Sequence, residues 1–282
     1  MDEMEQSGPS VWPVFVGFVV AMGGLMVGGV VVTLAFIALQ GDVKLDAALQ
    51  GAMRSPGYLF WVTVVSNLVF GATALVAVKV ERRVVAPRLR WPRPAGVRWS
   101  VFVAALLMAL GLSEGSDRVV ALLGLDLGST MKLLGAAVRE GSTTVFIGLT
   151  LLLTLAGLTE ELFFRGYIQT RLRWRWSPGV AVIVAAGLFG LAHFDPVHST
   201  LTLFIGIVLG AVTEVAGTIK PAVVAHCANN LFAGYSARFL VHTWYGTAHI
   251  PMLVGAVVVL AVGSVWLWRA APALPEQLAP PE

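Results

Sequence analysis

Residues 12–39 form an almost wholly apolar run without a charged side chain. A helix needs about 20 mainly apolar residues to cross the hydrocarbon core of a bilayer, so this run is long enough to span it. The ten residues before it carry three acids and no base. A signal peptide has a positively charged leader and a shorter apolar core. We therefore expect a retained first membrane span.

Further apolar runs follow along the whole chain. They lie at 58–78, 99–113, 143–163, 178–194, 199–215, 220–240 and 251–268. The run at 99–113, the third in the chain, is the least well defined because a second short run follows it at 119–128. Only 12% of the residues are charged, against about 25% in a typical globular domain. This excludes a nucleic-acid-binding protein, a disordered chain and an ordinary cytosolic enzyme. The sequence predicts an all-α, polytopic transmembrane bundle of about eight helices, with residues 1–282 forming a single integral membrane domain.

The basic residues indicate how the bundle is oriented, because Lys and Arg accumulate on the cytoplasmic side of short loops. With both termini in the cytoplasm, thirteen basic residues fall on the inner side and six on the outer side. Arginine outnumbers lysine by fifteen to four, and Ala, Val and Gly are abundant, which is typical of a high-GC bacterial genome. We expect a multi-pass protein of the bacterial inner membrane with both termini cytoplasmic.

Ionisable residues inside apolar runs are costly and therefore indicate a functional site. Glu160, Glu161 and Arg165 directly follow the run LTLLLTLAGL. Glu161 and Arg165 are four residues apart with the acid first, which favours an ion pair on a helix. Glu160 lies about 100° around the helix from Glu161, so we expect Arg165 to neutralise one carboxylate and to leave Glu160 free.

Two further polar clusters occur in later apolar runs. One is His193, which ends the sequence Phe-Gly-Leu-Ala-His, and the other is His226 with Asn230, one helical turn apart on one face. If one helix runs to about residue 173 and the next starts near Pro178, an antiparallel hairpin brings Glu160 and His193 to the same depth, since each lies about 20 Å from the turn.

These residue types together favour peptide hydrolysis by an activated water. A carboxylate beside a neutral imidazole in a dry cavity is a general-base pair. His226 and Asn230 have side chains that can donate hydrogen bonds to an oxyanion, and such donors are worth about 3 kcal/mol each. Glu160 and His193 are then the candidate base, and the mechanism needs no covalent nucleophile.

The three clusters resemble the motifs of the CAAX-protease and bacteriocin-processing (CPBP) family of intramembrane peptidases, related to the eukaryotic prenyl-protein endoprotease. The resemblance covers about residues 143–240, the predicted catalytic core. It implies that Glu160 and His193 activate water, that His226 and Asn230 form the oxyanion hole, and that Glu161 and Arg165 support the site. Members of the family act on different substrates, so the substrate expected here, a membrane-embedded or lipid-anchored peptide or protein, rests on the membrane setting and the bacterial composition. The lipid bilayer and a membrane protein are the candidate partners, and the low charge content excludes nucleic acid.

Other interpretations stay open at this point. No cofactor is expected, although Glu160, His193 and His226 could converge as three zinc ligands. Cys227 is expected to be a packed small side chain rather than a nucleophile, since adjacent helical residues point about 100° apart. A proton-coupled transporter is the main alternative, because intramembrane acids and histidines also form proton relays. A non-catalytic membrane scaffold of the same fold is another.

The remaining polar residues in or near apolar runs have structural interpretations. We expect Asp195 and His198 to lie in a solvated turn rather than in a site. Glu214 is expected to be a helix-end charge, with a cavity-lining role as the alternative. Asn67 and Ser236 are predicted to form hydrogen bonds between helices.

Overall fold

The computed structural model describes residues 9–41, 44–92, 97–125 and 129–271. This part of the chain is helical and contains no strand. The predicted all-α class is therefore confirmed. In chain order the helices are α1 (Trp12–Ala38), α2 (Leu45–Arg54), α3 (Pro56–Val80), α4 (Val85–Arg88), α5 (Trp99–Leu123), α6 (Ser129–Glu140), α7 (Thr143–Glu161), η1 (Leu162–Gln169), α8 (Thr170–Leu172), α9 (Pro178–Leu191), α10 (Pro196–Ala216), α11 (Lys220–Tyr235), η2 (Ser236–Leu240), α12 (Trp244–Thr247) and α13 (His249–Ala270).

Six helices in the described ranges are long and apolar enough to cross a membrane: α1, α3, α5, α10, α13 and the continuous helix Thr143–Leu172, which joins α7, η1 and α8. Their large apolar side chains are widely exposed, above all on α1 and α13. A helix that exposes apolar side chains along its length needs lipid as its solvent. The chain is thus a multi-pass integral membrane protein. The predicted spans at 178–194 and 220–240 correspond to the shorter helices α9 and α11, so the number of eight spans is not confirmed.

The third predicted span is longer than expected. The sequence predicts a helix over 99–113 and a separate run at 119–128, whereas α5 is one helix from Trp99 to Leu123. Two of the charges between the two runs, Glu114 and Arg118, are paired within the helix. Arg118 donates to Glu114 at 3.1 Å, one turn earlier, and its guanidinium lies 4.5 Å from the ring centre of Tyr245.

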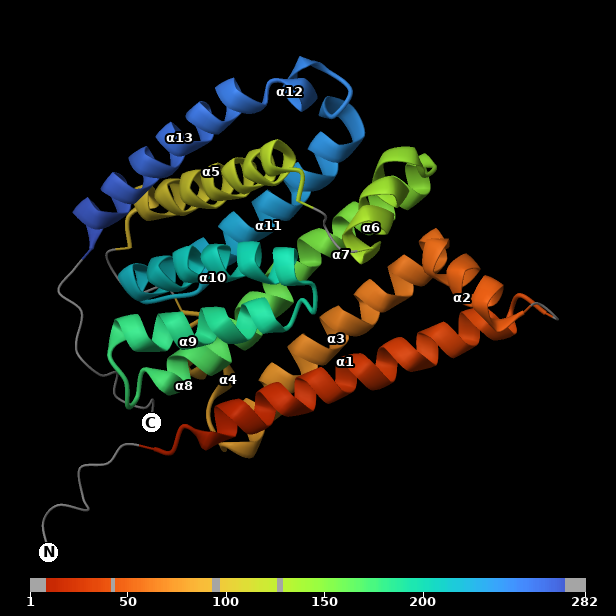
Figure 1. Ribbon diagram of the computed structural model, residues 1–282. Helices are drawn as coiled ribbons and strands as arrows, with labels where there is room; N and C mark the ends of the chain where they lie inside the picture. The colour runs from red at the N-terminus through yellow and green to blue at the C-terminus, as the bar shows by residue number, and fades with distance from the viewer. Residues whose placement is uncertain (1–8, 42–43, 93–96, 126–128, 272–282) are drawn as a thin grey trace, which may run out of the picture.

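The helix α7 lies in the middle of the bundle, between α3 on one side and α11 on the other (Figure 1). Beyond α3 lies α1, and beyond α11 lie α5 and α13. The hairpin of α9 and α10 packs against η1 and α5. The central helix therefore carries its polar residues into the interior, and the outer helices separate them from lipid.

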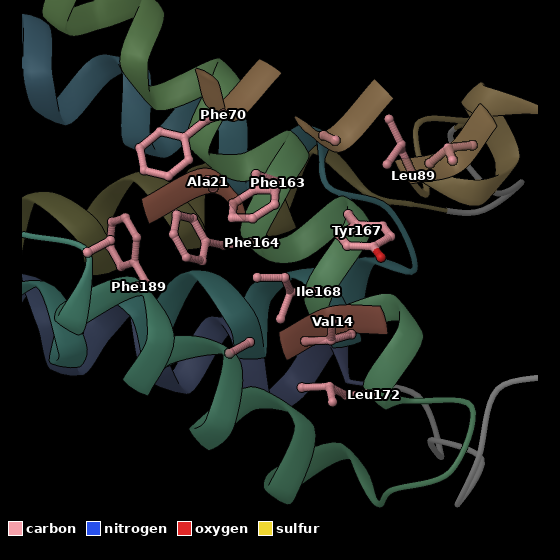
Figure 2. Packing of buried hydrophobic residues seen from close by; sticks show 14 of the residues in the cluster. Val14, Ala21, Phe70, Leu89, Phe163, Phe164, Tyr167, Ile168, Leu172 and Phe189 are labelled. Atoms are coloured by element: carbon pink, nitrogen blue, oxygen red, sulfur yellow. The ribbon is translucent and has the colours of Figure 1, made fainter. Parts of the chain in front are cut away.

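An aromatic cluster fills the interior beside η1 (Figure 2). The Phe70 ring from α3 lies 5.5 Å from that of Phe163 and 5.4 Å from that of Phe164. The Phe164 ring in turn lies 5.1 Å from the ring of Phe189 on α9. These side chains are almost completely buried. Close-packed aromatic rings hold a small set of relative orientations, so this cluster fixes α9 against η1.

Candidate active site

The buried ion pair that the sequence predicts is present at the end of α7. Arg165 Nη1 donates to Glu161 Oε1 at 2.9 Å, and both side chains are fully buried. Arg165 also donates to the carbonyl oxygen of Gly206 on α10 at 3.1 Å. A buried charge is tolerated when it is paired and hydrogen-bonded. The pair therefore links the central helix to α10 and neutralises Glu161.

The backbone changes its helical type directly after the two acids. α7 ends at Glu161, and η1 continues it as a π-helix from Leu162 to Gln169. Here the Thr170 hydroxyl donates to the carbonyl oxygen of Arg165, five residues earlier, at 2.9 Å. Turns of π-helix are rare and occur frequently at functional sites. The apolar pattern of the sequence contains no signal for this change, and we did not predict it.

His226 on α11 contacts both acids. Its Nδ1 lies 3.0 Å from Glu161 Oε1, and its Nε2 lies 3.6 Å from Glu160 Oε2. The Glu161 carboxylate already accepts a hydrogen bond from Arg165, so Nδ1 is the donor and carries a hydrogen. The two adjacent carboxylates thus have different surroundings: Glu161 is bound by Arg165 and His226, whereas Glu160 faces the second ring nitrogen of His226.

A glycine brings α11 close enough to α7 for this contact. A β-carbon at Gly157 would lie 2.9 Å from the backbone nitrogen of Cys227 and 3.1 Å from the carbonyl carbon of His226. A larger residue at this position would therefore push the two helices apart. Gly157 precedes Glu160 and Glu161 by about one helical turn, so the close approach lies next to the site.

His193 lies just beyond α9, in the turn that leads to α10. The predicted hairpin before it is present, because α8 ends at Leu172 and α9 begins at Pro178. His193 Nδ1 lies 2.8 Å from the carbonyl oxygen of Phe189. A carbonyl only accepts, so Nδ1 carries the hydrogen, and in the neutral ring Nε2 keeps a free lone pair.

The Phe189 ring connects all three motifs, although we did not propose it as a site residue. Its centre lies 4.9 Å from the ring of His193 and 5.8 Å from that of His226. The guanidinium of Arg165 lies 4.6 Å from the same ring centre. The position of Phe189 four residues before His193, one helical turn away, was the signal available in the sequence.

Asn230 lies one turn beyond His226 on α11. Its Nδ2 donates to the carbonyl oxygen of Leu153 on α7 at 2.8 Å. A primary amide has two N–H donors, so one remains for another acceptor. Asn230 therefore has its amide group fixed by the central helix.

His198 contacts the candidate site, whereas we expected it in a solvated turn. Its ring centre lies 4.6 Å from that of His193, with the rings at 74°. Asp195 does occupy a turn position, since it caps α10 and accepts a hydrogen bond from the backbone nitrogen of His198 at 2.7 Å. This cap turns the first residues of α10 back towards His193. The spacing of the two histidines around Asp195-Pro196 was the only sign of this contact in the sequence.

Glu214 lies in the last turn of α10, as expected for a helix-end charge, and it is buried. Its buried carboxylate accepts hydrogen bonds from Arg90 at 2.7 Å, Arg173 at 2.9 Å and Gln169 at 2.8 Å. These donors come from two segments that the sequence does not link to α10: Arg90 follows α4, and Gln169 and Arg173 lie at the end of the continuous helix that contains η1 and α8. Glu81 forms a similar centre, with Arg88 at 2.6 Å and Arg171 at 2.5 Å. Both networks join loops at one end of the bundle.

Of the two hydrogen bonds between helices that the sequence predicts, the one of Asn67 is present and the one of Ser236 is not. Asn67 on α3 accepts a hydrogen bond from Thr159 at 2.8 Å and donates to the Leu152 carbonyl at 3.3 Å, as predicted. For Ser236 the prediction was wrong, because its hydroxyl donates to the Ala233 carbonyl three residues earlier, at 3.1 Å. A serine hydroxyl commonly satisfies itself on the preceding helical turn.

The arrangement does not fit a metal site. In the described ranges no three His, Cys, Asp or Glu side chains converge in a way that could hold a metal ion. Glu160 and His226 face each other, and His226 uses its other ring nitrogen for Glu161. We therefore derive no chemical step through zinc.

Comparison with known proteins gives one match. No curated protein and no solved structure matches the chain. Residues 142–232 match a family model described as type II CAAX prenyl endopeptidase Rce1-like. The matched segment includes Glu160, Glu161, Arg165 and the other residues of the three motifs. This match agrees with the resemblance stated from the motifs, and it covers residues 142–232.

Proposed function

We propose that this protein is an intramembrane endopeptidase that hydrolyses a peptide bond of a membrane-anchored or lipidated peptide or protein. The observation that carries the proposal is the pair of adjacent carboxylates with His226 between them. Glu161 is neutralised by Arg165 at 2.9 Å, whereas Glu160 lies beside an imidazole nitrogen, and no arginine of the described ranges forms an ion pair with it. One carboxylate then supports the site, and the other is available for proton transfer.

In the proposed mechanism Glu160 is the general base. It removes a proton from a water molecule as the water oxygen attacks the peptide carbonyl carbon. The lone pair on His193 Nε2 accepts the second hydrogen of the water and orients it. The tetrahedral intermediate collapses when Glu160 returns its proton to the leaving nitrogen and the C–N bond breaks. A positioned base of this kind contributes about 10²–10⁴-fold to the rate.

The oxyanion is stabilised by Asn230 and His226 in this proposal. Asn230 offers its second N–H, because the first is donated to Leu153. His226 Nε2 can donate only when the ring carries a second proton, since Nδ1–H is directed at Glu161. The Glu161 carboxylate stabilises that charged ring. His226 Nε2 therefore donates to the oxyanion only while His226, and not Glu160, holds the proton that the two residues share.

The test is cleavage by the purified full-length protein in lipid. A lipid-anchored peptide library is incubated with the protein, and new termini are identified by mass spectrometry. We expect cleavage by the wild type and its loss in Glu160→Gln and in His193→Ala, with unchanged thermal unfolding. Glu140→Gln is a matched control, because Glu140 lies in an exposed pair outside the site. Activity retained by Glu160→Gln would exclude the general-base role.

We also propose that both termini lie in the cytoplasm of a bacterium, with the protein in its inner membrane. The excess of basic residues on the predicted inner side supports this orientation. The start of α5 and the end of α13 lie at the same end of the bundle as the start of α1 (Figure 1). Labelling of cysteines introduced near Ser10 and at Arg269 in intact cells and in inverted vesicles tests the orientation.

A further inference from the structure

A pocket of about 250 Å³ opens between the start of α5 and the end of α13, far along the chain from the candidate active site. It is lined by Arg98, Ser100, Trp266, Arg269 and Ala270. The two helices pack along each other, so residues at the two ends meet (Figure 1). Two guanidinium groups, one hydroxyl and one indole therefore surround the same space.

The two arginines of this pocket differ from others at the same end of the bundle. Arg88 and Arg171 share the Glu81 carboxylate, and Arg90 and Arg173 share that of Glu214. In the described part of the chain, neither arginine of the pocket lies within ion-pair distance of a carboxylate, and both are exposed. The pocket thus carries two positive charges that the described residues do not balance. It also lies at the N-terminus of α5, where the helix dipole adds to the positive potential.

The surroundings of the pocket place it at the level of the lipid headgroups. Trp99, Trp266 and Trp268 are all exposed around it, and tryptophan is enriched where a membrane meets water. α5 and α13 are both candidate membrane spans. The pocket therefore lies at the ends of two candidate spans, beside exposed tryptophans of the kind found at the level of lipid headgroups.

We propose that this pocket binds the phosphate group of an anionic lipid. Arginine binds phosphate through paired N–H donors, and the Ser100 hydroxyl adds a further donor. Trp266 and Ala270 contact the apolar part of the same molecule. Basic pockets between membrane helices on the cytoplasmic side are suited to anionic headgroups. A free phosphate ion would use the same donors but would leave the apolar wall unused.

The test measures lipid binding by the full-length protein in a nonionic detergent. Short-chain phosphatidylglycerol, short-chain phosphatidylcholine and inorganic phosphate are titrated separately, and Kd is obtained from the shift in thermal unfolding. The double variant Arg98→Gln, Arg269→Gln removes both charges of the pocket. The control variant Lys79→Gln, Arg82→Gln removes two exposed charges from the same side of the protein.

We expect phosphatidylglycerol to bind more tightly than phosphatidylcholine or inorganic phosphate. The pocket variant should weaken phosphatidylglycerol binding by roughly 30-fold, as two interfacial arginines imply, and the control variant should change it by less than about twofold. Both variants should unfold at the wild-type temperature without lipid, because the replaced side chains are exposed. Equal binding by the pocket variant and the wild type, or an equal loss in the control, overturns the proposal. Inorganic phosphate that binds as tightly as phosphatidylglycerol overturns the assignment to a lipid.

Discussion

Gly157→Ala should reduce activity without unfolding the protein, because Gly157 sets the distance between α7 and α11. The added β-carbon would meet backbone atoms of His226 and Cys227, the nearest at 2.9 Å. Backbone atoms cannot rotate away as a flexible side chain can. The two helices must therefore separate locally.

The size of the shift follows from the contact distance. An ordinary contact of a β-carbon begins at 3.4 Å, so the nearest pair must move from 2.9 Å by about 0.5 Å. The hydrogen bond from His226 to Glu161, now 3.0 Å, and the 3.6 Å contact with Glu160 then both lengthen. A misplacement of about 1 Å can cost about 100-fold in rate, so we expect roughly a tenfold loss in kcat/KM here.

The effect on stability should be small in comparison. Overpacking costs about 1–3 kcal/mol, and replacing glycine by alanine inside a helix returns about 1 kcal/mol. The net loss in the free energy of unfolding should thus be no more than about 2 kcal/mol. A measurement of kcat/KM together with thermal unfolding separates the two effects.

Gly148→Ala is the matched control in the same helix. Its β-carbon would lie 3.7 Å from the ring of Phe60, which is an ordinary contact. We expect unchanged activity and equal or slightly higher stability for this variant. Activity of Gly157→Ala within twofold of the wild type would show that the closeness of α7 and α11 does not position the site.

Three further predictions concern the buried carboxylates of Glu161 and Glu214 and the ring of His198. Glu161→Gln leaves Arg165 buried without its carboxylate and should lower the free energy of unfolding by about 3–5 kcal/mol. Glu140→Gln, which removes a carboxylate from an exposed pair, should change the free energy of unfolding by less than about 1 kcal/mol. Equal effects of the two variants would contradict the argument from burial. Glu214→Gln should destabilise by a similar amount, about 3–5 kcal/mol, and the two segments that carry Arg90 and Arg173 should be cleaved faster in limited proteolysis. An unchanged cleavage rate at both segments would contradict a role for Glu214 in holding them. His198→Ala should lower kcat several-fold, whereas His198→Phe should keep most of it, because the His198 ring packs edge to face against the ring of His193. Loss of kcat in both variants would instead indicate that a ring nitrogen of His198 is required.

The parts of the structure that the sequence predicts correctly depend on local information. The apolar runs mark the helices, and the acid-first spacing of Glu161 and Arg165 predicts their ion pair. The turn residues around Pro178 predict the hairpin between α8 and α9. Each of these inferences needs only residues within one or two helical turns of each other, where the helical period fixes which side chains meet.

The parts that the sequence does not predict depend on packing between distant segments. Arg90 and Glu214 are 124 residues apart, and nothing in either local pattern indicates the other. His198 lies beside His193 at the start of α10, which Asp195 caps. The π-helix η1 after Glu161 packs against α3, α9 and α10, and the local apolar pattern suits an α-helix equally well. Long-range contacts of this kind are set by the whole bundle.

The two adjacent glutamates of α7, Glu160 and Glu161, have different roles in the proposed site, and one carboxylate could not fill both. Glu161 is completely buried and already accepts from Arg165 and His226, so its negative charge is compensated and fixed. Among the residues that the structure describes, Glu160 has only the Nε2 side of His226 within ion-pair distance, at 3.6 Å. Transfer of one proton between Glu160 and His226 leaves the total charge of this buried group unchanged, whichever residue holds it. The Glu161 and Arg165 pair thus lets the proposed base and the proposed oxyanion donor exchange a proton without placing an extra net charge inside the membrane.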